Sequence, residues 1–452
     1  PGHATLTIPF IKKAQVGFDL SAALFGVGYI LGRRVALIMV GGGLLSALII
    51  IPAIAYWGDA RDVPFYPETL SLIRDMPTRD IWSRYVRYIG AGAVAAAGII
   101  TLIRSLPVML HSFRASAAQL ARQKNEGPSA ELPRTRQDLS LKTVGIGVLL
   151  IVAFLGFAPW AFGNVGGVGI RLVAALCVAL FAFFFVTVAA RIVGLVGVTS
   201  NPTSGMTIAA LLGTSTVFLL MGWTDGTGKA ATLIVGCVVA IAVSIAGDTS
   251  QDLKSGFLLG ATPKRQQRAE LIGVLTSAVF VCAAVILLGK AFGFGSTELP
   301  APQATLMRLV IDGVLDQNLP WGLVGIGVGI TLVCELFKIP SLPFAVGVYL
   351  PVSTMTPIFL GGMLRHYLEK RAANKEEMEG RRERGVLLGS GFVGGEGLLG
   401  VGIAGVAFAL NRKPEGIGTE WMGPEWLAEV LGFAAFLLLV YWFVRRVKRP
   451  DS

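Results

Sequence analysis

Charged residues are scarce in this sequence. Only 15% of its 452 residues are Asp, Glu, Lys or Arg, whereas soluble domains carry about 25%. A soluble protein of this length would usually divide into two or three domains with well-charged surfaces. The low charge argues against that class.

Cysteine and histidine are also rare. The four cysteines lie in apolar segments with no Cys-x-x-Cys or Cys/His spacing, at Cys177, Cys237, Cys282 and Cys334. Neither a zinc site nor a disulfide framework is indicated, so we expect these thiols to pack as small apolar side chains. The three histidines are isolated, and we expect no metal site and no cofactor.

Apolar residues, by contrast, make up 54% of the chain and come in blocks of membrane-crossing length. A helix needs about 20 apolar residues to cross a bilayer core of about 30 Å. The clearest blocks are 35–56, 145–160, 172–190, 230–247, 271–288 and 430–444. With the weaker segments 20–31 and 302–315, they predict an all-α, polytopic integral membrane protein. We expect about 11–12 transmembrane or re-entrant helices, some of them discontinuous.

The net charge of +11 could suggest nucleic-acid binding. The basic residues cluster between apolar blocks, however, as the positive-inside rule expects, and we predict no nucleic-acid partner. The stretch 111–142 has six basic and three acidic residues, a balance of +3. The other basic segments are the expected loop 264–270, the stretch 365–384 and the C-terminal tail at 445–449.

The basic stretches are placed in the cytoplasm, which makes the C-terminus of a multi-pass cell (inner) membrane protein cytoplasmic. Two parts are expected along the chain. Residues 1–142 form N-terminal membrane segments with a long outer loop (57–85) and a basic cytoplasmic loop (111–142), and residues 143–452 form a transport bundle. Counting crossings from Lys290 puts Arg365 on the wrong side, so either Pro302–Leu315 crosses as a polar, protein-lined helix or Trp321–Ser341 is re-entrant. Such segments line cavities or lie inside protein.

The most informative polar run is Gly247 to Thr262, directly after an apolar block. Asp248 and Asp252 are four residues apart and share one helical face, with Gln251 nearby and Lys254 following. Carboxylates within a membrane are costly and are candidates for function. Gly247 and Gly256 would allow a helix break or a short half-helix. The alternative is that this run is a solvated loop between two helices, without a functional role.

A second polar segment surrounds Asn201-Pro202. Proline opens a helix by removing a hydrogen-bond donor, and Thr203 and Ser204 supply hydroxyls, as Thr199 and Ser200 do. Arg191 lies at the end of the preceding apolar block. Discontinuous helices of this kind form substrate sites in secondary transporters. An ordinary interface turn is the alternative.

Two isolated acids, Glu335 and Glu396, have only apolar residues or glycines as immediate neighbours. Such surroundings disfavour the charged form of a carboxyl group, which suits a proton carrier. The alternative is that each carboxyl group makes a structural hydrogen bond to a helix break. Arg308, Asp312 and Asp316 on the weak segment are expected to be solvated.

At these residues the chain resembles the oligopeptide transporter family, in its bacterial or archaeal branch, which is related to the yellow-stripe-like transporters of metal chelates. The matching stretches, in the family's order, are SNPTSGMTI (200–208), GDTSQDLKSG (247–256), LGATP (259–263), PQATLM (302–307), NLPW (318–321), FAVGVYLP (344–351) and SGFVGGE (390–396). They cover roughly residues 18 to 410. The resemblance implies further helices upstream of residue 1.

The resemblance implies a secondary active transporter, not an enzyme, that imports oligopeptides or peptide-like metal chelates with protons by alternating access. The substrate and ion pathway is predicted at Arg191, Asn201, Thr203, Ser204, Asp248, Gln251, Asp252 and Lys254, and proton coupling at Glu335 and Glu396. Expected partners are the peptide or chelate, protons and the lipid bilayer. A homo-oligomer is left open.

Two other classes compete. Asp248 with Asp252, and Asp312 with Asp316, are Asp-x-x-x-Asp pairs, which intramembrane prenyltransferases use to hold magnesium and a pyrophosphate. A channel-type membrane subunit is the third hypothesis. Saturable uptake that follows a pH gradient would exclude a passive pore.

Overall fold

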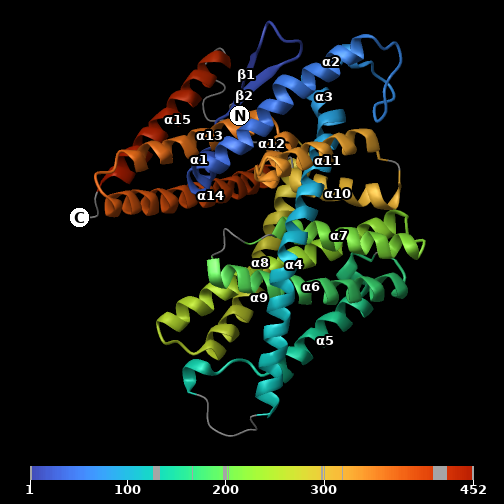
Figure 1. Ribbon diagram of the computed structural model, residues 1–452, viewed down its shortest axis with the longest axis vertical. Coiled ribbons are helices and arrows are strands. Elements are labelled where there is room, and N and C mark those ends of the chain that lie inside the picture. Colours follow the sequence, from blue (N-terminus) through green and yellow to red (C-terminus); the bar gives the residue numbers. More distant parts are fainter. Residues whose placement is uncertain are drawn as a thin grey trace. The chain divides into compact units, whose positions relative to one another are not determined.

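The computed structural model describes residues 3–125, 133–164, 166–196, 201, 203–296, 299, 301–317, 319–410 and 425–449, and this part of the chain is almost entirely helical (Figure 1). Its strands are β1 (His3–Thr7) and β2 (Gln15–Asp19), an antiparallel hairpin. The helices are α1 (Ala22–Leu45), α2 (Ile51–Asp59), α3 (Thr78–Ile81), α4 (Arg87–Asn125), α5 (Leu141–Phe157), α6 (Val168–Val196), α7 (Thr203–Leu220), α8 (Gly226–Leu258), α9 (Pro263–Phe292), α10 (Pro302–Leu315), α11 (Trp321–Leu336), α12 (Ser341–Tyr349), α13 (Val352–Lys370), α14 (Lys375–Leu410) and α15 (Glu425–Lys448).

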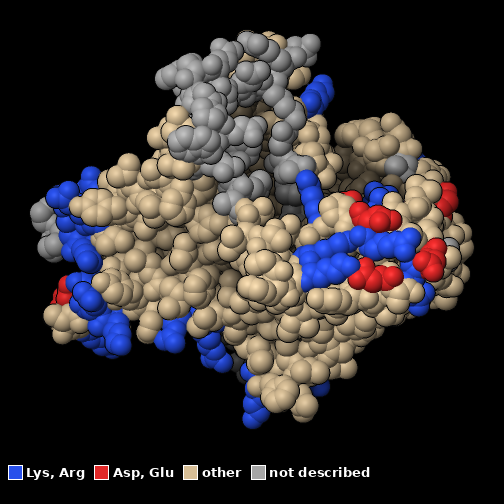
Figure 2. Space-filling model, turned by 90° about the horizontal axis from the view of Figure 1, so that it is seen from above, with Lys and Arg blue, Asp and Glu red and all other residues tan. Residues whose placement is uncertain are grey.

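Seven helical segments in the described residues are long and apolar enough to cross a membrane. They are Ala22–Asp59, Val168–Gly194, Thr203–Leu220, Gly226–Leu258, Pro263–Phe292, Lys375–Leu410 and Val430–Lys448. Helix α9 has no buried residue although its middle is apolar, which water would not tolerate but lipid favours. On the face drawn in Figure 2, uncharged residues cover broad areas between separate groups of charge. These features confirm the all-α polytopic class.

The chain folds into two compact units that alternate along the sequence. Unit 1 comprises residues 1–94, 284–302 and 320–452, and unit 2 comprises 95–283 and 303–319. The expected division after residue 142 remains a prediction. The sequence had also placed His111 and Lys264–Glu270 in loops, whereas the structure places them in α4 and α9.

Unit 1 contains the discontinuous helix that was expected, but at a different glycine. Helix α1 is interrupted at Gly32, whose φ of 79° and ψ of 172° are not helical. The buried guanidinium of Arg365 donates to the carbonyl oxygens of Tyr29 and Ile30, at 3.2 and 2.8 Å, beside this break. Glu369 balances its charge at 2.8 Å. A helix break within a membrane protein frees carbonyl groups, and Arg365 satisfies two of them.

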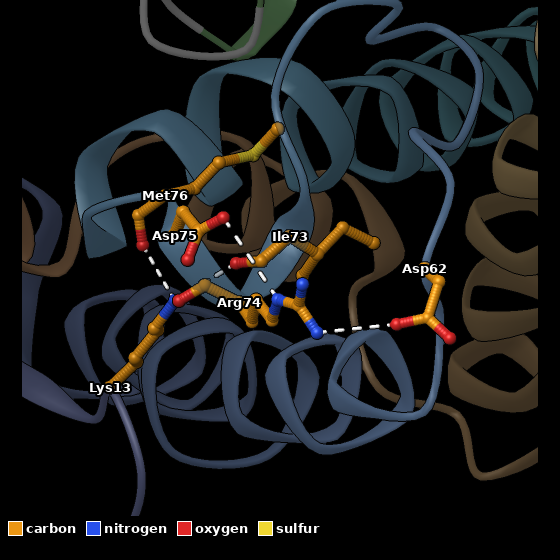
Figure 3. Close-up of polar contacts among 6 residues, drawn as sticks. All are labelled: Lys13, Asp62, Ile73, Arg74, Asp75 and Met76. Carbon is orange, nitrogen blue, oxygen red and sulfur yellow. Dashed lines mark hydrogen bonds and ion pairs between the residues drawn. The ribbon is translucent and has the colours of Figure 1, made fainter.

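Lys13 holds the hairpin of unit 1 against the segment 57–85, which the sequence predicts to be an outer loop (Figure 3). Its ammonium group donates to the carbonyl oxygens of Ile73, Arg74 and Met76, at 2.9, 2.7 and 2.7 Å. Burial lowers the pKa of Lys13, and the adjacent charge of Lys12 adds to this effect. Three carbonyl acceptors use the full donor capacity of an ammonium group.

Glu68 organises the same loop. Its carboxylate accepts the N–H groups of Thr69 and Leu70, both at 2.9 Å, and lies 3.2 Å from the guanidinium of Arg84. The N–H of Leu70 is the largest of the causes that lower the pKa of Glu68 below its ordinary value. The outer loop predicted at 57–85 thus has defined internal structure.

Within each unit the basic stretches meet. In unit 1, Arg381 donates to the carbonyl of Leu368 and Arg384 to that of Val447, joining the start of α14 to the ends of α13 and α15. In unit 2, the N–H of Lys264 donates to the carbonyl of Gln137. Basic stretches that the charge pattern puts on the same side of the membrane therefore lie together within each unit. That this side is the cytoplasmic one stays a prediction.

The region of the parity conflict holds helices too short to cross alone. Helix α10 has 14 residues and α12 has nine, which correspond to about 21 and 14 Å of a core about 30 Å thick. The crossing of 302–315 and the re-entrant course of 321–341 stay predictions.

Candidate functional site

The predicted polar run lies on the last third of α8, in unit 2. Asp248, Gln251, Asp252 and Lys254 are all exposed there. The expected helix break is wrong, because α8 is continuous from Gly226 to Leu258. The carboxylates therefore project from an intact helix, four residues apart on one side.

Gly247 provides a contact rather than a break. A Cβ atom at this position would lie 2.9 Å from Nδ2 of Asn201 and 3.2 Å from Cγ2 of Val193. The Asn201 amide donates to the carbonyl of Val243 at 3.1 Å, so the side chain lies directly against α8. Among the described residues, nothing pairs with its buried Oδ1 atom. The Asn-Pro segment and the Asp248 run are thus neighbours in space.

The end of α6 completes this junction. Lys254 of α8 donates to the carbonyl of Gly194 at 2.9 Å, one turn beyond the half-buried Arg191. Helix α7 then begins with Thr203, half-buried, and Ser204, exposed. The predicted pathway residues therefore gather where α6 ends, α7 begins and α8 carries its carboxylates. Thr199, Ser200 and Pro202 lie outside the described residues.

Helix α9 adds two side chains that sequence reasoning missed. Nε2 of Gln266 donates to the carbonyl of Asp252 at 3.0 Å, and Glu270 faces Thr249 and the charge of Asp252. One buried oxygen of each, Oε1 in both cases, has no hydrogen-bond partner in the described part of the chain. Their spacing of four residues was a helical signal, but the basic residues around them had suggested a loop.

Glu396 is a residue of α14, in unit 1, and its carboxylate contacts the beginning of α1. One of its oxygens accepts the Ser21 hydroxyl at 2.9 Å, and the other accepts the Ala23 N–H at 2.8 Å. Ser21 is the N-cap of α1 and accepts the N–H of Leu24. A carboxylate is favoured at this position because a helix N-terminus carries unpaired N–H groups and a partial positive charge.

Glu335, also in unit 1, joins two short helices. It is half-buried near the end of α11, and its Oε1 accepts the hydroxyl of Ser341, the first residue of α12. Ser341 is only 5% exposed, so the contact is shielded from solvent. Both predicted proton carriers thus accept hydrogen bonds from the first turns of other helices.

The second acidic pair does not join the first. Lys229 of α8 lies 3.0 Å from Asp312 and also pairs with Asp316, so both carboxylates are already compensated. Lys229 precedes Asp248 by 19 residues of continuous helix, about 28 Å at 1.5 Å per residue. In a prenyltransferase site both acidic pairs must reach the same substrate. A separation of about 28 Å along α8 does not support such a site. Nor do the described His, Cys, Asp and Glu residues form a group of three placed to hold a metal.

The membrane-length helices define the class of this protein as a polytopic membrane protein. Residues 5–407 match the OPT oligopeptide transporter proteins, and the chain belongs to this family.

Relatives are known in bacteria and plants. A protein of Haemophilus influenzae named "Putative oligopeptide transporter" is 30% identical, with 98% of this chain and 76% of the relative covered. The rice protein "Probable metal-nicotianamine transporter YSL14" is 24% identical, with 88% of this chain and 56% of the relative covered. An Arabidopsis thaliana protein, "Probable metal-nicotianamine transporter YSL8", is 25% identical over 76% of this chain and 49% of its own length. The chain thus spans about half the length of the plant relatives.

Proposed function

We propose that the protein belongs to a secondary active transporter that imports oligopeptides or peptide-like metal chelates, coupled to protons, by alternating access. The family and the names of the relatives support the substrate class. The observation that carries the proposal is the junction in unit 2, where Asn201 and Lys254 bring α6, α7 and the carboxylates of α8 together.

The chemistry of this junction suits a ligand that carries both charges. A peptide amino terminus or a chelated cation would meet Asp248 or Asp252, which are exposed on α8. The ligand carboxylate would meet Arg191 or Lys254. Asn201, with an unpaired acceptor, and the nearby Thr203, Ser204 and Gln251 would supply hydrogen bonds. Charged groups inside a membrane protein are energetically costly, so their presence favours a functional role such as this one.

Proton coupling is proposed at Glu335 and Glu396. A carboxyl group that takes up a proton loses part of its acceptor capacity. Protonation would therefore weaken the contacts to Ser341 in α12 and to Ser21 in α1. Proton occupancy would then favour one arrangement of these helices over another, and such a differential affinity is what coupling requires.

Uptake into proteoliposomes tests the proposal. Di- to tetrapeptides and metal chelates are supplied with and without a proton gradient, and the Asp248→Asn variant is expected to lose uptake while it expresses normally. Ser244→Ala is the matched control, because Ser244 is exposed on α8 one turn before Asp248. Full uptake by Asp248→Asn would refute the assignment of the site.

A further inference from the structure

Four charged side chains form a network between α8 and α10, within unit 2. Lys229 of α8 bridges Asp312, at 3.0 Å, and Asp316, while Arg308 lies 3.5 Å from Asp312. The side chains of Lys229 and Asp312 are only 26% and 25% exposed. In the Arg74–Asp62 pair of the outer loop, the corresponding exposures are 45% and 90%.

Helix α10 is built to present this network. Arg308, Asp312 and Asp316 are spaced four residues apart and form one stripe. Leu306 and Ile311 are buried, and Ile311 packs in the main apolar core of unit 2. Apolar packing thus holds one face of α10, and the bridge to Lys229 holds another.

The position of α10 along the chain is unusual. The chain leaves unit 1 at residue 302, contributes residues 303–319 to unit 2, and re-enters unit 1 at residue 320. A movement that alters the path of the chain between the units must pull on this short segment. The Lys229 bridge is a polar contact that such a pull would load.

The charges of the network favour the arrangement in which α10 contacts α8. While α10 lies against α8, the single positive charge of Lys229 compensates the net charge of −1 on Arg308, Asp312 and Asp316. When they separate, Lys229 is left without a partner on a candidate membrane helix, where an unpaired charge is costly.

Two neighbouring charged residues make contacts of their own. Asp225, the N-cap of α8, accepts the N–H of Gly228, which lowers its pKa below the ordinary value. Arg171 at the start of α6 donates to the carbonyl of Gly166.

We propose that Lys229, Asp312 and Asp316 form a charge latch, closed in this structure, that must open and close again in each transport cycle. The role in the cycle rests on the proposed function, whereas the closure of α10 on α8 can be tested without a substrate.

Hydrogen–deuterium exchange of the whole protein in lipid nanodiscs tests the latch. In Lys229→Met we expect exchange in α10 to be about tenfold faster, which is the effect of losing two partly shielded ion pairs, and exchange in α7 to be unchanged. Lys229→Arg keeps the charge and should remain close to the wild type. Exchanging the charges in Lys229→Asp/Asp316→Lys should restore much of the protection.

Lys375→Met is the matched control, because it removes an exposed ion pair with Glu379, and it should leave α10 unaffected. Unchanged α10 exchange in Lys229→Met, or faster exchange throughout unit 2, would overturn the latch. Lys229→Met should also lower the maximal uptake rate at least fivefold; a wild-type rate in that variant would overturn the role in transport. If the wild-type protein takes up neither peptide nor chelate, the proposed function fails, while the exchange result still decides whether the latch exists.

Discussion

The contact between Gly247 and Asn201 yields a prediction that can be worked out from distances. In Gly247→Ala, the new Cβ atom would lie 2.9 Å from the Asn201 amide nitrogen and 3.2 Å from a methyl group of Val193. Both distances are too short for relaxed contact, so Asn201 has to shift, and we expect the shift to weaken its hydrogen bond to Val243.

Two opposing terms set the magnitude. Alanine gains up to about 1 kcal/mol over glycine in a helix, whereas a buried amide without a partner costs roughly 1–3 kcal/mol. We therefore expect Gly247→Ala to destabilise the protein by about 1 kcal/mol. Gly273→Ala is the matched control, because no atom lies within 4 Å of a Cβ placed on this α9 residue. It should be neutral or stabilising, by at most about 1 kcal/mol.

The assay is unfolding in detergent, followed for Gly247→Ala, Asn201→Ala and the double variant. Asn201→Ala removes the group that clashes, so the double variant should be more stable than the sum of the single effects predicts, by about 1 kcal/mol. Additive effects, within about 0.3–0.5 kcal/mol, would mean that the two residues do not touch. Stabilisation by Gly247→Ala equal to that of Gly273→Ala would refute the reasoning as well.

Two further predictions concern unit 1. Glu396→Gln should lower stability by roughly 1 kcal/mol, as expected for a weakened charged cap at Ser21 and Ala23, and should abolish the acceleration of uptake by a proton gradient; retention of that acceleration would remove Glu396 from coupling. The N–H of Leu70 lowers the pKa of Glu68 in the folded protein. The contribution of the Glu68 carboxylate to stability is therefore complete above its ordinary pKa of 4.5, and it is lost as the pH falls through the lower pKa of the folded state. Limited proteolysis of the outer loop should therefore accelerate on acidification below about pH 4.5 in the wild type but not in Glu68→Gln, and equal acceleration in both would contradict this account.

The class of protein could be predicted from the sequence because it depends on local composition. Blocks of about 20 apolar residues require a membrane wherever they lie in the fold. The motifs around Asn201 and Asp248 indicated the family, which the match over residues 5–407 confirmed. The basic stretches were also informative, since those within one unit meet in the structure.

The use of individual glycines could not be predicted. Gly247 and Gly32 look alike in the sequence, but Gly32 has a positive φ beside Arg365 whereas Gly247 lies in a regular helix against Asn201. Which role a glycine has depends on the segment that packs against it. That segment is 46 residues away for Gly247 and 333 for Gly32.

The partners of the acids were equally inaccessible. Asp312 and Asp316 were expected to be solvated, but Lys229, more than 80 residues earlier, compensates both. Glu396 accepts hydrogen bonds from the start of α1, 375 positions away along the chain from Ser21. The sequence by itself determined that this is a helical membrane transporter, because hydrophobic length and local motifs suffice for that. Only the tertiary structure decided which charges pair and which helices break, because those outcomes depend on contacts between residues far apart in the chain.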